Sequence, residues 1–507
     1  MKTTKRQAFT RILLVFAIVV LLNFIAERFS FRLDMTAERR YTLSPATKNL
    51  VSEIKGPVTI SLYFSKDLPP EFEYAKQEMV NLIKELDSRS KKHILYKIIN
   101  PNENEETEKQ AIQKGIQAQI LSTQDRDKMN AKRVFLGAEI IYGGNTDVIP
   151  VLPVGENLEY LLASSLKKLT IVNKPVIGIV GGNGEAGPDQ LPQFQQALSN
   201  MYEVKFINLN AVTPTPKEYK CLILIDPHDT FPDAEFKALD NYLAAGGNIF
   251  IGSPMIDVDL QSAQVTAKKT NLGNWLVQKG ILIKQNIIID AQCGEVNIPQ
   301  NMGAVSYTVP VKFPYYPYIT HFGDNPAAKG ITSLGMPFTS EIIFKPATNV
   351  KSTILATTSD KSNALDAPQV FNFSRPWQES DFTRQDIPVG VALCGPIVGN
   401  TPSKLVVVSS GSFLVNVKQQ PLPGDNLSFA TNIIDWLSDE TGLIDLRSKT
   451  IAFRPLEKVS DEAMLSYKWF NVLLPVILII IIGLMRNAFQ KSRRKRWMRE
   501  AKLSEHD

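Results

Sequence analysis

The chain has 507 residues, of which 44% are hydrophobic and 21% charged, and its formal net charge is +5 at pH 7. This length gives room for two or three domains with substantial cores. The composition excludes a disordered or low-complexity protein, so an ordered chain is expected.

The first predicted segment is a membrane anchor. Basic residues at 2, 5, 6 and 11 precede a nearly uninterrupted apolar run from Ile12 to Ala26. A cleaved signal peptide is the alternative, but the following residues, NFIAERFSFR, contain no A-x-A cleavage pattern. We expect a cytoplasmic N-terminus (1–11) and a transmembrane helix (12–28), close to the lower length limit for a span.

Residues 29–172 are predicted to form an α/β unit. The expected elements are a helix after Ser44-Pro45, a strand at 57–65, a helix at 74–88, a strand at 93–101, a helix at 105–114, two strands paired around Gly143–Asn145, and a helix at 156–169. This order is that of a thioredoxin-like unit. A redox enzyme of that shape needs a thiolate after its first strand, and the first cysteine of the chain is Cys221. Redox chemistry is therefore excluded.

Residues 173–445 are predicted to form a second α/β unit. Apolar strands at PVIGIV, Cys221–Asp226 and NIFIG alternate with amphipathic helices, which indicates a mostly parallel sheet covered on both faces. Later strands at 353–359, 389–394 and 404–410 are expected to complete that sheet. A long excursion at about 256–350 lies between them.

The loop GGNGEAG follows the first of these strands, where a doubly wound sheet places a nucleotide-binding turn. Its glycines, at 181, 182, 184 and 187, do not have the G-x-G-x-x-G spacing, and no Lys-Ser/Thr pair follows. Glu185 would meet an incoming phosphate with like charge. We expect a tight turn rather than a phosphate site.

Other candidate sites are incomplete. The DPHD motif (Asp226–Asp229) offers two carboxylates and an imidazole, but the only other histidines are His93, His321 and His506. SSGSF (Ser409–Phe413) does not match the G-x-S-x-G nucleophile elbow. Cys221, Cys293 and Cys394 show no metal-ligand spacing, although one disulfide is open to them. The sequence predicts no catalytic residue, cofactor or metal ion.

One stretch suggests contact with a partner. VPVKFPYYPYITHF contains Phe313, Tyr315, Tyr316 and Tyr318 among prolines that are expected to keep it irregular. Aromatic-rich irregular segments are common at interfaces. A loop packed on its own domain is the alternative interpretation.

A second membrane span is predicted at 469–485, after a linker at 446–468. The tail at 486–507 contains KSRRKRW. Because basic clusters flank both apolar runs on their outer sides, both termini are expected in the cytoplasm and the bulk of the chain in the periplasm. Residues 12–485 contain 44 Lys and Arg against 48 Asp and Glu. The positive charge is thus a topology signal, which disfavours nucleic-acid binding.

Seven stretches in this order resemble the GldG family of gliding-motility-associated auxiliary proteins of ABC-2 type transporters. They are RLDMTAERRYTLSPATKNL, LYFSKDLPPEF, IGIVGGNGE, LDNYLAAGGNIFIG, ATTSDKSNAL, DNLSFATNIIDWLSDE and the terminal NVLLPVILIIIIGLMRNAFQKSRRKRW. The chain departs from the family at VVSSGSFLVN, where an acidic turn resembling GDSDF is expected.

The resemblance implies a non-catalytic inner-membrane subunit that associates with a permease and an ATPase, which binds the ATP. It also implies that the second unit has a fold similar to the GIFT and glutamine-amidotransferase folds, without catalytic residues. The alternatives are an envelope hydrolase or amidotransferase-like enzyme, with Asp226, His228 and Glu185 as its best candidates, and a receptor for a periplasmic ligand.

Overall fold

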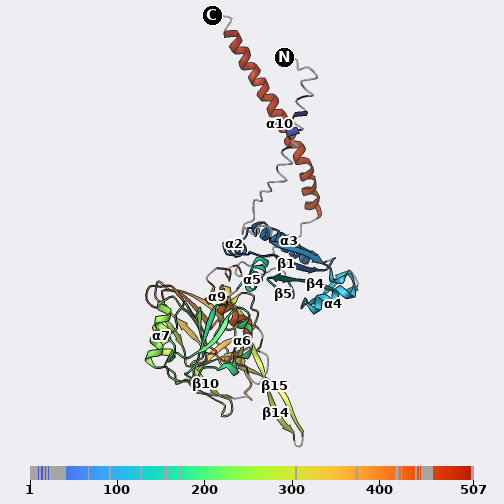
Figure 1. Ribbon diagram of the computed structural model, residues 1–507. Helices are drawn as coiled ribbons and strands as arrows, with labels where there is room; N and C mark the ends of the chain where they lie inside the picture. Colours follow the sequence, from blue (N-terminus) through green and yellow to red (C-terminus); the bar gives the residue numbers. More distant parts are fainter. Residues whose placement is uncertain are drawn as a thin grey trace. The chain divides into compact units, whose positions relative to one another are not determined.

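The computed structural model describes residues 42–446 and 461–503, with gaps at 67, 91–92, 126–127, 153–156, 172, 303–304, 372–374, 417–421, 424, 440–441 and 445, and separate residues at 10, 13, 14, 17, 18 and 21. Most of the predicted first span (12–28) lies outside the described residues. Residues 1–451 form one compact unit and residues 452–507 a second. Figure 1 shows the chain as a ribbon.

The first region (residues 42–171) is built on a five-stranded sheet with the order β2-β1-β4-β3, in which β5 also pairs with β4. Its strands are β1 (Val58–Phe64), β2 (Ile94–Ile99), β3 (Ala118–Asp125), β4 (Lys128–Tyr142) and β5 (Asn145–Ile149). Strands β1 and β2 are parallel, and β4 runs antiparallel to its neighbours. The predicted hairpin at Gly143–Asn145 is confirmed, because Gly143 and Gly144 adopt the positive φ angles that its tight turn requires.

Four helices accompany this sheet: α2 (Pro45–Ser52), α3 (Pro70–Arg89), α4 (Glu105–Gln113) and α5 (Leu158–Thr170). The expected helix start at Ser44-Pro45 is confirmed: the Ser44 hydroxyl accepts a hydrogen bond from Thr47 N at 3.1 Å. The alternate residues Val58, Ile60 and Leu62 of β1 are fully buried in one core with residues of α3 and α5. Strand β3 was not expected from the sequence.

The second region (residues 173–446) contains an eight-stranded sheet with the order β16-β19-β22-β23-β9-β8-β6-β7. Its strands are β6 (Val176–Val180), β7 (Glu203–Ile207), β8 (Cys221–Ile225), β9 (Asn248–Gly252), β16 (His321–Phe322), β19 (Lys351–Thr357), β22 (Pro388–Gly395) and β23 (Ser403–Val408). The five strands from β23 to β7 are parallel, while β22, β19 and β16 add antiparallel pairs. The later strands that the sequence predicts therefore do complete this sheet.

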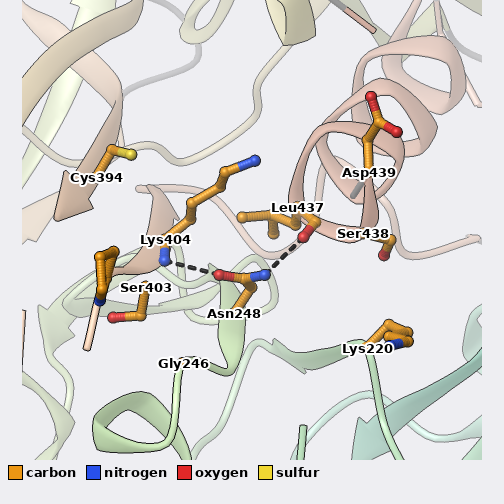
Figure 2. Close-up of a pocket in the computed structure, with 10 residues that line it drawn as sticks. Lys220, Gly246, Asn248, Cys394, Ser403, Lys404, Leu437, Ser438 and Asp439 are labelled. Atoms are coloured by element: carbon orange, nitrogen blue, oxygen red, sulfur yellow. Dashed lines mark hydrogen bonds between the residues drawn. The ribbon is translucent and has the colours of Figure 1, made fainter. Parts of the chain in front are cut away.

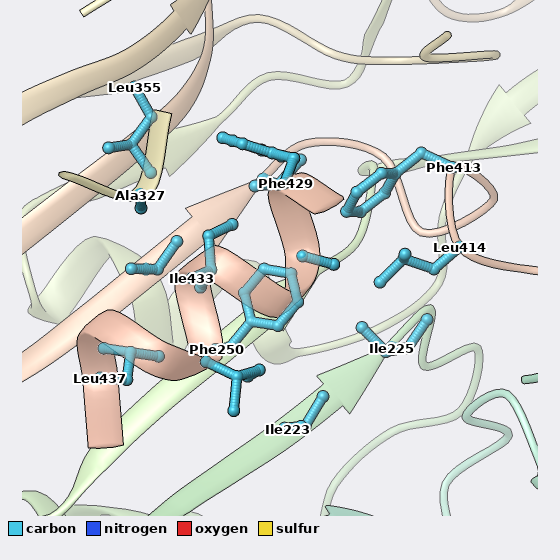
Figure 3. Close-up of a cluster of buried hydrophobic side chains, with 14 of the residues drawn as sticks. Ile223, Ile225, Phe250, Ala327, Leu355, Phe413, Leu414, Phe429, Ile433 and Leu437 are labelled. Carbon is cyan, nitrogen blue, oxygen red and sulfur yellow. The ribbon is translucent and has the colours of Figure 1, made fainter. Parts of the chain in front are cut away.

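Helices cover both faces of the second sheet. Helices α6 (Pro192–Ser199) and α9 (Asn426–Ser438) contribute to the core on one face, and α7 (Asp233–Ala244) and α8 (Leu272–Gln278) to the core on the other. Figure 3 shows the first of these cores, where Phe429 and Ile433 of α9 lie over Ile223 and Phe250 of the sheet. This two-sided burial explains why the strands are apolar at nearly every position rather than at alternate ones.

The excursion between β9 and β19 consists largely of short strands in the part that the structure describes. Besides α8 and β16 it contains β10 (Ile256–Asp259), β11 (Gln264–Ala267), β12 (Ile281–Ile283), β13 (Asn286–Asp290), β14 (Cys293–Met302), β15 (Val305–Ile319), β17 (Leu334–Gly335) and β18 (Ile342–Phe344). Strands β20 (Ser362–Asp366) and β21 (Gln369–Val370) follow β19 and pair back onto β13 and β11. Strands β14 and β15 form a long hairpin (Figure 1).

The expectation that prolines keep residues 309–322 irregular is wrong, because most of this stretch belongs to β15. Two devices accommodate the prolines. Pro314 lies where the β14–β15 register shifts, between the pairs Cys293–Pro317 and Glu295–Lys312. Pro317 joins the neighbouring segment through its carbonyl, which accepts from Met336 N at 2.9 Å.

Residues 452–507 contain helix α10 (Asp461–Leu503). Its segment Lys468–Ser492 spans 25 residues, contains an 18-residue window with a mean hydropathy of 2.4 and, by length and composition, could cross a membrane. This segment includes the predicted span at 469–485. Pro475 lies within the helix, as is tolerated in membrane helices.

Candidate functional site

The carboxyl edge of the parallel strands is where ligands of α/β proteins bind, at the point where the strand order reverses. Here that point lies between β6 and β8, because the chain passes from β6 to β7 on one side and then to β8 on the other. The glycine loop follows β6 and the DPHD motif follows β8. The structure therefore brings together the two motifs that the sequence singles out.

These two loops are bonded to each other rather than held apart. The carbonyl of Asn183 accepts hydrogen bonds from His228 N at 3.1 Å and Asp229 N at 2.9 Å, and Ala186 N donates to Ile225 O at 2.8 Å. A Cβ added to Gly184 would lie 3.1 Å from the His228 Cβ. The crevice that would receive a nucleotide is thus closed by backbone contacts.

Several amides of the glycine loop are also committed. Gly181 N donates to Ile207 O at 2.9 Å, and Asn183 N donates to the Glu185 carboxylate at 2.6 Å. Gly182 and Gly184 have φ angles of 129° and 75°, which favour glycine. A phosphate cradle needs free amides, so the loop has the properties of the tight turn that the sequence predicts.

A buried carboxylate fixes this loop from below. Glu235 on α7 is 1% exposed, and it accepts hydrogen bonds from Asn183 Nδ2 at 2.6 Å and from the Asn210 amide. It thereby joins the loops after β6 and β7 to a helix. Neither Glu235 nor the asparagines carry a recognisable sequence motif, and the sequence analysis missed them.

A cluster of charged and titratable side chains, formed by Asp226, His228, Asp257 and Lys268, lies beside these loops. The amine of Lys268, whose side chain is fully buried, lies 2.6 Å from Asp226 Oδ1. His228 is 3.6 Å from the other Asp226 oxygen and 3.1 Å from Asp257 Oδ1. Asp226 has a φ of 52°, which is rare for a residue with a side chain. The sequence identified Asp226 and His228 as candidates but gave no signal for Lys268 or Asp257.

The ionisation of this group follows from its contacts. Burial opposes the charge of Asp226, but hydrogen bonds from His228 and Lys268 outweigh it and lower the pKa of the carboxyl. The hydrogen bond to Asp226 raises the pKa of His228. The Asp226 carboxylate is therefore held in its ionised form and is contacted by both Lys268 and His228. Glu185, the third candidate, contacts its own loop instead.

The serines of SSGSF do not supply a nucleophile to this group. The hydroxyls of Ser410 and Ser412 donate to Pro337 O at 3.0 and 3.1 Å, and that of Ser409 donates to Val389 O at 3.1 Å. Phe413, which follows, points into the core of the second region (Figure 3). The segment has a structural role in these contacts.

A polar cleft of about 180 Å³ lies at the opposite edge of the sheet, where β8, β9 and β23 begin (Figure 2). Asn248 bridges it, accepting from Lys404 N at 2.8 Å and donating to Leu437 O at 2.7 Å. The Lys404 amine donates to Trp436 O at 2.7 Å. These groups satisfy carbonyls at the end of α9, so the cleft is built around a helix C-terminus.

One group of residues has the composition of a metal site. One ligand atom each from His321, Asp360 and Asp386 lie within 4.8 Å of one another, with His321 Nδ1 3.2 Å from Asp386 Oδ1. His321 is half-buried and both carboxylates are exposed. A divalent ion held there would have three protein ligands and keep open positions for water.

The aromatic residues predicted to contact a partner fall into two pairs. Phe313 and Tyr315 are 5% and 4% exposed and pack with Phe371 in a core under the β14–β15 hairpin. Tyr316 and Tyr318 are half-buried and stack on each other with ring centroids 5.4 Å apart. A partner would find only the second pair accessible, and the contact itself stays a prediction.

The three cysteines are free thiols. Cys221 is fully buried, as the apolar strand around it predicts, and burial raises the pKa of its thiol. Cys293 is half-buried and Cys394 is exposed at the cleft.

Comparisons with known proteins indicate which family the chain belongs to. An uncharacterized protein of Borreliella burgdorferi is 26% identical over 483 residues, which cover 90% of this chain and 93% of that protein. A model of a domain of unknown function matches residues 37–141.

Several solved structures match weakly. The N-terminal domain of mmIFT52 is 14% identical, covering 52% of this chain and 97% of that chain, with a TM-score of 0.36. A ThuA-like protein from Parabacteroides merdae is 11% identical, covering 56% and 94%, with a TM-score of 0.29. All of these scores lie below 0.5, and the likenesses carry no conclusion.

The second region gives the decisive match. The family model described as an ABC-type uncharacterized transport system matches residues 174–438, which include the eight-stranded sheet, the loops at its carboxyl edge and α9. Since this match spans more than half of the chain, the protein belongs to the family of auxiliary components of ABC-type uncharacterized transport systems.

Proposed function

We propose that the chain is a non-catalytic auxiliary subunit of an ABC-2 type transporter in the inner membrane. In this proposal it associates with a polytopic permease and a cytoplasmic ATPase, and it presents its two α/β regions as a periplasmic scaffold. The family match over residues 174–438 is the observation that carries the proposal. The complex would serve gliding motility or export across the envelope.

Helix α10 supports membrane attachment. Its apolar side chains are exposed, with Phe470, Ile479 and Leu484 at 61%, 70% and 64%. An exposed apolar surface of this length needs lipid or other helices around it. The basic residues of KSRRKRW follow directly, and positive charge stays on the cytoplasmic side. With a second span at 12–28, both termini would be cytoplasmic.

The loops at the carboxyl edge support a role without chemistry. The glycine loop is bonded to the DPHD motif, and the serine hydroxyls donate to backbone carbonyls. Energy would therefore come from ATP hydrolysed by the partner, and this subunit would couple the transporter's cycle to a structure in the periplasm.

Co-purification tests the proposal. A C-terminally tagged chain is extracted from native membranes in mild detergent, and the proteins recovered with it are identified by mass spectrometry. The proposal predicts a polytopic permease together with an ATP-binding protein. Recovery of the chain alone, after cross-linking as well, would contradict it.

An envelope hydrolase is the alternative, and the Asp226, His228 and Lys268 group favours it enough to justify a test. Alanine replaces Asp226, His228 and Glu185 together, and cellular function is scored beside Asp189→Ala, an exposed carboxylate on the same edge. A loss of function with normal folding in the triple variant alone would support an enzyme. Unchanged function would remove that alternative.

A further inference from the structure

The edge strand β2 of the first region carries an apolar surface. It pairs with β1 alone among the described residues, so its other edge is open. Leu95, Tyr96 and Ile98 are 61%, 37% and 49% exposed. Edge strands of monomers are usually blunted by charge. The other sheet follows this rule at its edge strand β7, where exposed Glu203 and Lys205 form an ion pair at 3.3 Å.

The even-numbered residues of β2 continue the buried core outward. In the parallel register, Ile94, Tyr96 and Ile98 lie beside Val58, Ile60 and Leu62 of β1, which are fully buried. Because residues two apart share a face, the apolar row of the core extends to the open edge of the sheet.

The backbone groups of the same residues point to that edge. Val58 N donates to His93 O at 2.8 Å, while Ile94 N donates to the Asp87 side chain rather than to β1. Alternation along the strand then directs the N–H and C=O groups of residues 94, 96 and 98 outward, away from β1. The open edge thus offers apolar side chains together with the C=O group of Ile94 and the N–H and C=O groups of Tyr96 and Ile98, since Ile94 N is already bonded to Asp87.

We propose that this edge pairs antiparallel with β2 of a second copy of the chain, joining two sheets across a two-fold axis at Tyr96. Outward-directed residues must face each other, so only even-numbered residues pair with even-numbered ones. With Tyr96 opposite Tyr96 of the second copy, Ile94 lies opposite Ile98, and Lys97 lies opposite Leu95. Every outward pair is then apolar.

The other registers are less favourable. A shift by one step in one direction places Lys97 opposite Lys97 of the second copy, and like charges directly opposite are destabilising. A shift in the other direction leaves Ile98 without an opposite residue in β2 of the second copy, so one apolar pair is lost at each end. The sequence ILYKII is therefore self-complementary in one antiparallel arrangement, which is why the second copy is the occupant that fits this edge.

The register gives a cross-linking test on the full chain in native membranes. Cys293 and Cys394 are replaced by serine, and buried Cys221 is kept. Tyr96→Cys and Lys97→Cys are compared after mild oxidation. Residues opposite each other in a hydrogen-bonded pair have Cα atoms about 5.5 Å apart, within disulfide range. Two copies of Lys97 are offset by two residues, so their Cα atoms are about 8 Å apart.

We expect Tyr96→Cys to shift from monomer to disulfide-linked homodimer on non-reducing gels, while Lys97→Cys stays monomeric. As an independent check, differently tagged copies carrying Leu95→Cys and Lys97→Cys should cross-link to each other, because these positions are opposite. Three results would overturn the proposal: no dimer in either experiment, equal dimer from Tyr96→Cys and Lys97→Cys, or a Tyr96→Cys adduct with a different protein.

Discussion

Replacing Glu341 by glutamine should lower the free energy of unfolding at pH 7 by about 3 kcal/mol. Glu341 is 5% exposed and lies just before β18. Its carboxylate accepts a two-pronged pair of hydrogen bonds from Arg384, at 2.6 and 2.9 Å, and one from Asn286 at 3.2 Å. Lys284 lies 3.3 Å away. The residue therefore joins segments around β12, β13 and β22 of the second region.

The magnitude follows from the ionisation of this carboxyl. The Arg384 hydrogen bonds lower the pKa of Glu341 from 4.5 to about 2. At about 1.4 kcal/mol for each unit, this difference corresponds to the stabilisation stated above. Since the pKa of the folded state is depressed, the stabilisation is fully present above pH 4.5 and is lost as the pH falls toward 2.

Thermal unfolding of the full chain in detergent, followed by tryptophan fluorescence between pH 3 and pH 7, measures this effect. The matched control is Glu379→Gln, whose carboxylate pairs with Lys361 at 2.6 Å but is 87% exposed, so its removal should change little. The midpoint of Glu341→Gln should lie well below that of the native chain at pH 7, and the gap should narrow at low pH. Equal midpoints for Glu341→Gln and the native chain at pH 7, or a gap that does not depend on pH, would refute the reasoning.

Four further predictions concern the core and the carboxyl edge. Lys268→Met should lower the free energy of unfolding by about 3 kcal/mol, because it leaves the Asp226 carboxylate without its buried partner. Adding Asp226→Asn to this variant should recover part of the lost stability in the same melts. Glu235→Gln should lower the free energy of unfolding by about 2 kcal/mol, since one of the two acceptor oxygens becomes a donor amide that faces an asparagine amide, and limited proteolysis should show earlier cleavage near residues 181–187. Phe250→Ala should lower the free energy of unfolding by about 4 kcal/mol because the ring is fully buried, whereas exposed Ile120→Ala should change it by less than about 0.5 kcal/mol. The raised pKa of His228 should add less than about 1 kcal/mol to the free energy of unfolding, since the side chain is 53% exposed. This contribution is present below pH 6.5 and is lost as the pH rises through the raised pKa, and melts of His228→Gln should not show it.

The alternation of strands and helices could be predicted from the sequence, because the residue pattern within each element indicates whether it is a strand or a helix. Runs such as Cys221–Ile225 are buried at every position, and a parallel sheet covered on both faces demands such runs. Ser44 and the Gly143-Gly144 turn likewise act through neighbours only a few residues away. These contacts are local, so sequence patterns report them.

The features that escaped prediction depend on contacts between distant segments. Pro317 joins a strand through its carbonyl, which accepts a hydrogen bond from Met336 in a neighbouring segment. Lys268 is buried because the turn after β8 brings Asp226 to it across 42 residues of sequence. A single lysine in a polar stretch forms no periodic pattern from which a distant partner could be predicted. The pairing of Glu341 with Arg384 could not be predicted from sequence for the same reason.

The most direct test of the auxiliary-subunit account is photolabelling with an azido-ATP analogue of the complex recovered through the tagged chain. The account predicts that the label appears on a co-purified partner, competes with ATP, and spares this chain. Label on this chain itself, or the lack of any labelled partner in a complex stabilised by cross-linking, would contradict the central claim.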